Sequence, residues 1–181
     1  MPSAVTVYRV FVASPGGLED ERETFRRLLN DYNESDALED GALFIPVGWE
    51  LARAGIGRPQ ELINRDLQRC DYCVLILWDR WGSPSDVTGK YSSGTEEEYY
   101  VARELITAGT MRELIVLFRA VDPSKLSDPG PQLERVLAFR RELETKKELL
   151  FSTYDELPAF ETYLRKQLGA WLRQHRQASL K

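Results

Sequence analysis

Short apolar segments and longer amphipathic segments alternate along most of this chain. Five apolar segments have the length and composition of strands, the third and fourth buried on both faces: about 5–13, 42–49, 71–78, 112–120 and 148–153. Apolar residues recur with a helical period in five other segments, at 18–32, 58–69, 95–109, 131–147 and 155–175. This alternation favours an α/β domain in which right-handed crossovers join mostly parallel strands.

Five parallel strands with helices on both faces most commonly take the flavodoxin-like order 2-1-3-4-5, which makes a three-layer sandwich. Ligands of such sheets bind outside the carboxyl ends of the strands, where the strand order reverses between strands 1 and 3. Two loops therefore become candidates for a binding site. The first follows strand 1 and is Ser14-Pro15-Gly16-Gly17, and the second follows strand 3 and begins Asp79-Arg80-Trp81.

Both loops have features that are common in binding loops. The first leads into a helix whose free N–H groups could receive a phosphate or a ribose hydroxyl. The second continues through the polar insert 82–94, and a loop of that length in a compact domain is more often functional than idle. Trp49, Trp78 and Trp81 lie at strand ends or just beyond, where each could cover the core or line a pocket for a planar ring.

Three consecutive glutamates, Glu96, Glu97 and Glu98, begin the helix predicted at 95–109. A structural explanation is available, because Thr95 and Glu98 have the spacing of a capping box and acidic residues suit a first turn. A functional explanation is available too. Helical spacing puts Glu98, alone of the three, on the face that packs against the sheet. Partial burial there would raise its pKa and make it a candidate acid, base or cation stabiliser.

Size and charge narrow the possible functions. With 181 residues and 43% hydrophobic residues, the chain suits one domain over 1–174 and a polar tail 175–181, which is compatible with truncation before another domain. A net charge of −5 without a strongly basic segment disfavours nucleic-acid binding. No apolar run is long enough to span a bilayer and no signal peptide is recognisable, so we expect a soluble cytoplasmic protein.

The few cysteine and histidine residues restrict the chemistry further. Cys70 and Cys73 lack the second pair of ligands that a zinc site needs, so we expect two structural thiols and no metal. The single histidine, His175, falls in the expected frayed tail, which excludes Ser-His-Asp and Cys-His hydrolase mechanisms. Glu50, directly after strand 2, is a second possible acid.

Four stretches of the chain together resemble the N-terminal TIR-like domain of unknown function that precedes the NTPase in many signal-transduction ATPases of the STAND class. They are VFVASPGGLEDER, Trp49-Glu50, INRDLQRCDYCVLILWDRWGS and SGTEEEYYVA, and the resemblance covers most of residues 6 to about 120. The family pattern is carried by Glu21-Arg22, by Arg80-Trp81-Gly82, and by a helix start that runs from Ser93-Gly94-Thr95 through Glu98-Tyr99 to Ala102.

That family is placed beside TIR domains and nucleoside 2-deoxyribosyltransferases, which share the flavodoxin-like fold and a glutamate on a helix. The deoxyribosyltransferase motif is Asp-x-Gly-Thr-x-x-Glu, and Gly94-Thr95-x-x-Glu98 is similar to its last part. The resemblance implies that Glu98 stabilises or attacks a ribosyl cation when an N-glycosidic bond breaks. Ser92 stands where the motif has Asp, so that carboxylate is missing or is supplied elsewhere, by Asp79 or Glu50.

Two hypotheses follow. In the first, the chain is a TIR-like enzyme of an immune or cell-suicide system that hydrolyses the nicotinamide–ribose bond of NAD, which is its substrate, with Glu98 as catalytic residue. The nucleotide would be bound by Ser14, Pro15, Gly16, Gly17, Trp49, Asp79, Trp81, Ser93 and Thr95. Resemblance to TIR enzymes also implies a homo-oligomer.

In the second hypothesis, the chain is a non-catalytic module. It would make homotypic contacts, present a sensor or partner to a following NTPase, or bind a nucleotide-derived signal. The serine at position 92 and the capping box, which accounts for Glu98 structurally, favour this second hypothesis.

Overall fold

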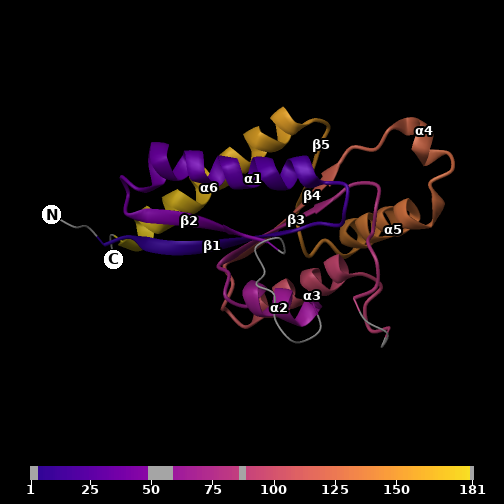
Figure 1. Cartoon of the computed structure of the whole chain (residues 1–181), viewed down its shortest axis with the longest axis horizontal. Coiled ribbons are helices and arrows are strands. Elements are labelled where there is room, and N and C mark those ends of the chain that lie inside the picture. The colour runs from indigo at the N-terminus through magenta and orange to yellow at the C-terminus, as the bar shows by residue number, and fades with distance from the viewer. Residues whose placement is uncertain (1–3, 49–58, 86–88, 180–181) are drawn as a thin grey trace.

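The computed structural model describes residues 4–48, 59–85 and 89–179, in which five parallel strands form one sheet between two layers of helices (Figure 1). The strands are β1 (Thr6–Ala13), β2 (Ala42–Val47), β3 (Tyr72–Leu77), β4 (Glu113–Arg119) and β5 (Phe151–Tyr154). They pair in the order β2-β1-β3-β4-β5, every pair parallel. This is the predicted flavodoxin-like order, and the predicted fold class is confirmed.

Helices cover both faces of the sheet. On one face lie α1 (Glu19–Tyr32) and α6 (Leu157–Ser179), and on the other lie α2 (Pro59–Leu67), α3 (Gly94–Thr107) and α5 (Gly130–Lys146) (Figure 1). Two short elements were not predicted from the sequence: a π-helical turn η1 (Asn33–Ala37) and the single turn α4 (Pro123–Leu126). Asn33 holds the first against β2, because its Nδ2 donates a hydrogen bond to the Phe44 carbonyl and its Oδ1 accepts one from the Phe44 N–H, at 2.8 Å each.

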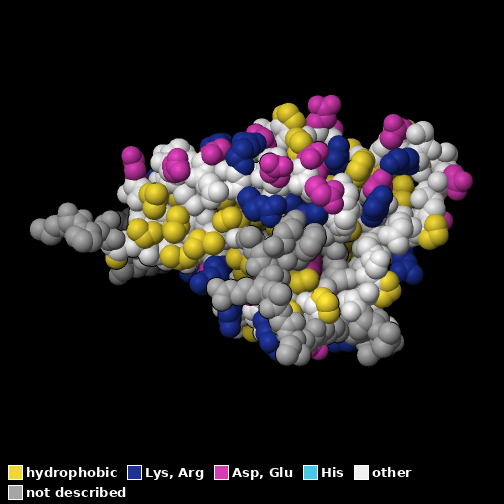
Figure 2. All heavy atoms as spheres, in the orientation of Figure 1, with side chains coloured by type: hydrophobic (Ala, Val, Ile, Leu, Met, Phe, Trp, Pro, Cys, Tyr) yellow, Lys and Arg dark blue, Asp and Glu magenta, His cyan; other side chains and the backbone are white. Residues whose placement is uncertain are grey.

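The sheet separates two hydrophobic cores, and β3 contributes to both because every one of its six residues is buried. The helical cover is incomplete at one corner. Val5, Val7 and Ile45 keep 37%, 41% and 36% of their surface exposed. They lie on the side of β1 and β2 that faces away from α1, and Figure 2 shows hydrophobic side chains gathered over these two strands.

The C-terminal end of α6 differs from the sequence-based expectation. His175 was expected in a frayed tail, but α6 continues to Ser179 and buries the histidine. One ring nitrogen, Nδ1, lies 2.9 Å from the Tyr8 hydroxyl, and the other, Nε2, lies 3.0 Å from the Asp40 carbonyl oxygen. The expectation was wrong because both polar partners come from segments far away in the sequence.

Trp171 joins α6 to the central strand of the sheet. It is fully buried, and its ring stacks on Tyr72 of β3 with 4.0 Å between ring centroids and 17° between ring planes. Its indole Nε1 donates a hydrogen bond of 2.7 Å to Glu113 Oε2. The same side chain therefore fills the core and satisfies a carboxylate at the start of β4.

We predict that Trp171→Ala lowers the free energy of unfolding by about 3–5 kcal/mol, because it leaves a cavity against Tyr72 and removes a donor from Glu113. Trp171→Phe should cost less, since it keeps part of the ring contact. Chemical denaturation followed by circular dichroism measures both changes. A loss below about 1 kcal/mol for the alanine variant would show that α6 is not anchored through this residue.

Candidate functional site

A cavity of about 540 Å³ lies outside the carboxyl ends of β1 and β3, where the strand order reverses. We call it the strand-end crevice. Its walls come from the loops after β1 and β3 and from the first turn of α5, and consist of Gly16, Asp79, Arg80, Gly82, Ser83 and Gln132. The strand order thus places a cavity where the sequence analysis expected one, and its use for ligand binding remains a prediction.

The loop after β3 is held in place by hydrogen bonds from its backbone N–H groups to α5. The side-chain oxygen of Gln132, in the first turn of α5, accepts hydrogen bonds from the N–H groups of Trp81 and Gly82, at 2.8 and 3.0 Å. Gly82 has a φ of 97°, and a Cβ at this position would lie 3.4 Å from Ser93. The loop after β3 therefore packs closely against the start of α3, and a larger residue than glycine would be strained there.

Charged side chains beside the crevice differ in their pairing. Asp79 forms an ion pair with Lys125, with 2.7 Å between Oδ2 and Nζ. Arg80 is exposed and has no hydrogen-bond or ion-pair partner in the described parts of the chain. Its side chain passes close to Gly17, because a Cβ added at that residue would lie 3.8 Å from Arg80 Cδ and Nε. An unpaired guanidinium beside glycine backbone is suited to an anionic group such as a phosphate.

The predicted nucleotide-binding residues do not all face this crevice. Ser14 is buried, and its hydroxyl accepts a hydrogen bond of 2.8 Å from Arg22, which also donates to the Pro15 carbonyl. Trp81 is only 4% exposed, packs on Phe139, and donates its indole N–H to Ser92 Oγ at 2.7 Å. The ring of Trp81 therefore belongs to the core in this structure. Trp49 and Glu50 lie outside the described residues.

The start of α3 corrects the predicted capping box. The N-cap is Ser93, whose hydroxyl accepts a hydrogen bond of 3.0 Å from the N–H of Glu96. Glu96 in turn accepts from the N–H and the hydroxyl of Ser92, at 2.5 and 2.7 Å. Thr95 is buried inside the first turn, so the box lies two residues earlier than predicted. Capping consequently gives no structural reason for a glutamate at position 98.

The expectation that Glu98 alone faces inward was wrong, because Glu97 is buried as well. α3 packs against α2 in addition to the sheet, so its buried surface is wider than a stripe facing the strands alone. Glu97 accepts hydrogen bonds from Asn64 Nδ2 at 2.8 Å and from the Ser85 hydroxyl at 2.5 Å. Its role is to join α2 and the loop after β3 to α3.

Glu98 is only 6% exposed, and this burial raises its pKa from the usual 4.5 to about 8. A hydrogen bond from Gln60 lowers the pKa, and the nearby charge of Glu97 raises it. The bond from Gln60 Nε2 to Glu98 Oε1 is 3.2 Å long. Beneath it, burial and the charge of Glu98 raise the pKa of the Cys73 thiol well above its usual range. At pH 7 the site therefore holds a neutral carboxyl group beside a neutral thiol.

Gln60 is the residue of this site that sequence reasoning missed. A Cβ at position 94 would lie only 2.6 Å from Gln60 Oε1, so glycine at this position leaves room for the Gln60 side chain over the start of α3, and a larger residue would displace its amide. Gln60 also donates to Asn64, one helical turn further along α2, at 3.2 Å. The sequence did contain a signal for this contact. Gln60 and Asn64 are four residues apart, so their amide side chains lie on the same face of α2.

The remaining sequence expectations concern thiols, metals and membranes. Cys70 and Cys73 are both buried and free, and burial raises the pKa of Cys70 to about 12. Among the described residues, no group of three His, Cys, Asp or Glu side chains is placed to hold a metal ion. No helix in the described ranges is long and apolar enough to cross a membrane.

The chain matches one known family in sequence and known structures in fold. The family described as Domain of unknown function (DUF4062) matches residues 9–169. No curated protein matches the chain. The apo form of translation elongation factor SelB from Methanococcus maripaludis has 9% identity and a TM-score of 0.50, covering 94% of this chain and 36% of SelB. The chain thus spans about a third of that factor, and this likeness shows the fold alone.

A second solved structure contains TIR domains. It is the activated Roq1 resistosome that directly recognises the pathogen effector XopQ. Its TIR domains have 18% identity to this chain and a TM-score of 0.43, with 89% of this chain and 96% of the TIR chain covered.

We predict that Glu98→Gln stabilises the protein, increasingly so as the pH rises. The folded chain keeps a proton on Glu98 up to pH about 8, whereas the unfolded chain loses it near 4.5, so the native protein loses stability across this window. Glutamine does not titrate. The variant should therefore gain roughly 2–4 kcal/mol over the native chain between pH 5 and pH 8, as measured by denaturation at several pH values.

The matched control is Glu104→Gln, on the exposed side of the same helix, which should show no such pH-dependent gain. If Glu98→Gln is instead less stable than the native chain throughout this pH range, Glu98 makes a structural contact that glutamine cannot replace.

Proposed function

This chain belongs to the DUF4062 family, and we propose that it is a TIR-like effector domain that hydrolyses the bond between nicotinamide and ribose in NAD. The observation that carries the proposal is Glu98, a buried carboxyl group that α3 does not need for its cap. Burial of an ionisable group costs stability, and groups with pKa values shifted this far concentrate at functional sites.

The proposed reaction needs one well-placed carboxylate. The bond between C1′ of the ribose and the pyridinium nitrogen breaks, and its electron pair leaves with nicotinamide. Water adds to C1′, which gives ADP-ribose, nicotinamide and a proton. Positive charge develops on the ribose in an oxocarbenium-like transition state, and an ionised Glu98 would stabilise that charge in a desolvated site. The cationic pyridinium would itself favour ionisation of Glu98 as it approaches.

The nucleotide end of NAD would lie in the strand-end crevice. Arg80, which has no partner among the residues that the structure describes, offers a cation there, and Gly16 offers backbone without a side chain in the way. Gly82 and Ser93 connect this crevice to the first turn of α3, which leads to Glu98. Gln60 covers Glu98, so the substrate would have to displace its side chain or shift α2. We propose a homo-oligomer in immune or cell-suicide defence as the setting in which this happens.

A second candidate is a non-catalytic module of a STAND-type signalling protein, which binds a nucleotide-derived signal or makes homotypic contacts. One observation favours it. Glu98 does not line the strand-end crevice, so a nucleotide could occupy the crevice without contacting a catalytic group. Both candidates use the same crevice, and only the first needs Glu98 to be ionised.

The experiment is nicotinamide release from NAD by the purified chain at high concentration with a crowding agent. We expect Glu98→Gln to lower kcat by at least about 100-fold while circular dichroism shows an intact fold. We also expect kcat/KM of the native chain to rise with pH up to about 8, because the carboxylate is the active form.

Glu104→Gln serves as the control and should keep full activity. Activity that survives Glu98→Gln refutes the catalytic assignment. A native chain that releases no nicotinamide under these conditions, yet binds NAD by calorimetry, would favour the signal-binding module instead.

A further inference from the structure

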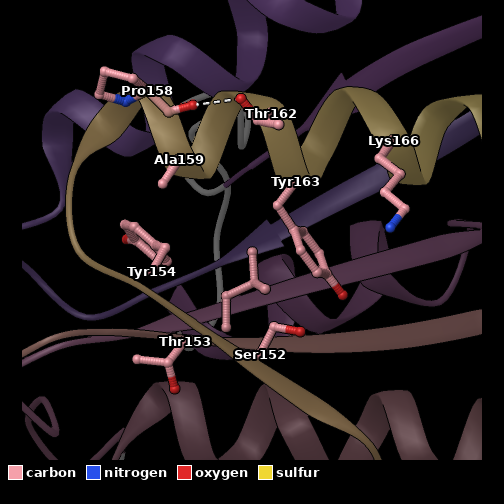
Figure 3. Close-up of a pocket in the computed structure, with 9 residues that line it drawn as sticks. Ser152, Thr153, Tyr154, Pro158, Ala159, Thr162, Tyr163 and Lys166 are labelled. Carbon is pink, nitrogen blue, oxygen red and sulfur yellow. Dashed lines mark hydrogen bonds between the residues drawn. The ribbon is translucent and has the colours of Figure 1, made fainter.

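A second cavity, of about 580 Å³, lies between α6 and β5, the strand at the opposite edge of the sheet from β2 (Figure 3). We call it the β5–α6 cavity. One part of its wall is apolar and consists of Leu117, Pro158, Ala159 and the ring of Tyr154. The other part is polar, because Tyr163 and Lys166 project from α6 towards the strands, and the Ser152 hydroxyl lies on the same side (Figure 3). Its volume is in the range of ligand pockets.

The backbone of β5 next to this cavity is open to a further strand. The carbonyl of Tyr154 accepts a hydrogen bond of 2.7 Å from the N–H of Ala120, so residue 154 directs its backbone groups towards β4. Successive residues of a strand alternate in this direction, so Phe151 and Thr153 direct theirs outwards, where the described chain has no strand beyond β5. An unpaired edge with an adjoining pocket is the arrangement that binds extended peptides by strand addition.

The charge on α6 indicates what such a peptide carries. Arg165, Lys166 and Arg173 are exposed on this helix and form no ion pair with any described residue. They line an adjoining hollow of about 610 Å³, which shares Pro158, Thr162 and Lys166 with the β5–α6 cavity. Glu161 also lines this hollow, and it forms an ion pair with Arg27 of α1. The chain as a whole has a net charge of −5. Because Glu161 is already paired with Arg27, these three cations, which have no ion-pair partner in the described ranges, give the hollow a local positive charge that complements an acidic partner.

We propose that the β5 edge and the β5–α6 cavity bind an extended acidic segment of a partner protein, which adds to the sheet as a sixth strand. Side chains on one face of that segment recur every second residue. One apolar side chain enters the cavity against Ala159 and Tyr154, and an acidic side chain two residues along pairs with Lys166. Backbone hydrogen bonds with Thr153 supply affinity, and the pocket and the cation supply specificity.

The test uses a phage-displayed library of random heptapeptides, selected on the immobilised chain. We expect enriched peptides to carry an apolar residue followed two positions later by Asp or Glu. Thr153→Pro removes the outward N–H, and the fold should tolerate it because edge strands accept proline at such positions. It should weaken binding of the enriched peptide at least about 10-fold, whereas Thr153→Ala, the matched control, should change binding less than about 2-fold.

Further measurements separate strand addition from other occupants. Peptide binding should slow hydrogen exchange at the Thr153 amide, and Lys166→Glu should abolish binding, whereas Arg141→Glu on the far helix α5 should not. Absence of enrichment over the bare matrix overturns the proposal. A peptide that binds Thr153→Pro as tightly as the native chain also overturns it, because such a peptide does not add to the β5 edge. Self-association of the chain that Ala159→Trp abolishes overturns it too, because the occupant of the cavity is then a second copy of this chain.

Discussion

The burial of β3 on both faces is the constraint on which the rest of this structure depends. Six consecutive residues without exposed surface need a helical layer on each side, so the chain must cross from one face of the sheet to the other. β3 pairs with β1 on one side and with β4 on the other. The reversal of strand order between β1 and β3 opens the strand-end crevice beyond their carboxyl ends, and the loops that line it are positioned by this central strand.

The burial of Glu98 lowers the stability of the fold at neutral pH. Within the described part of the chain, its carboxyl group accepts one side-chain hydrogen bond, from Gln60, and lies beside the buried Cys73 thiol. Desolvation raises the pKa of Glu98 to about 8. The helix obtains its cap from Ser93 and Glu96 instead. The capping role that the sequence analysis considered for Glu98 therefore belongs to Glu96, and capping does not account for a buried carboxyl group at position 98.

The strand-end crevice and the β5–α6 cavity are joined by polar contacts along the carboxyl ends of the strands. Tyr154 lines the second cavity and donates a hydrogen bond of 3.1 Å to Glu21, which also pairs with Arg119 at 2.9 Å. The guanidinium of Arg119 lies 4.3 Å from the ring centroid of Trp78, and Lys125 Nζ, 5.0 Å from the same centroid, pairs with Asp79 of the strand-end crevice. The second carboxylate oxygen of Glu21 is buried without a partner among the described residues. A partner at β5 and a nucleotide in the crevice would thus contact opposite ends of one charged network.

The sequence by itself determined the strands, the main helices and their order, because the apolar period of each segment depends only on local geometry and on which face is buried. It also pointed to Glu98 and to the loops after β1 and β3. Only the tertiary structure decided that Ser93 caps α3, that Trp81 belongs to the core, that His175 is held by Tyr8 and Asp40, and that Gln60 lies over Glu98. Each of these depends on contacts between distant segments, and a local pattern carries no information about which distant donor, acceptor or ring will meet a side chain.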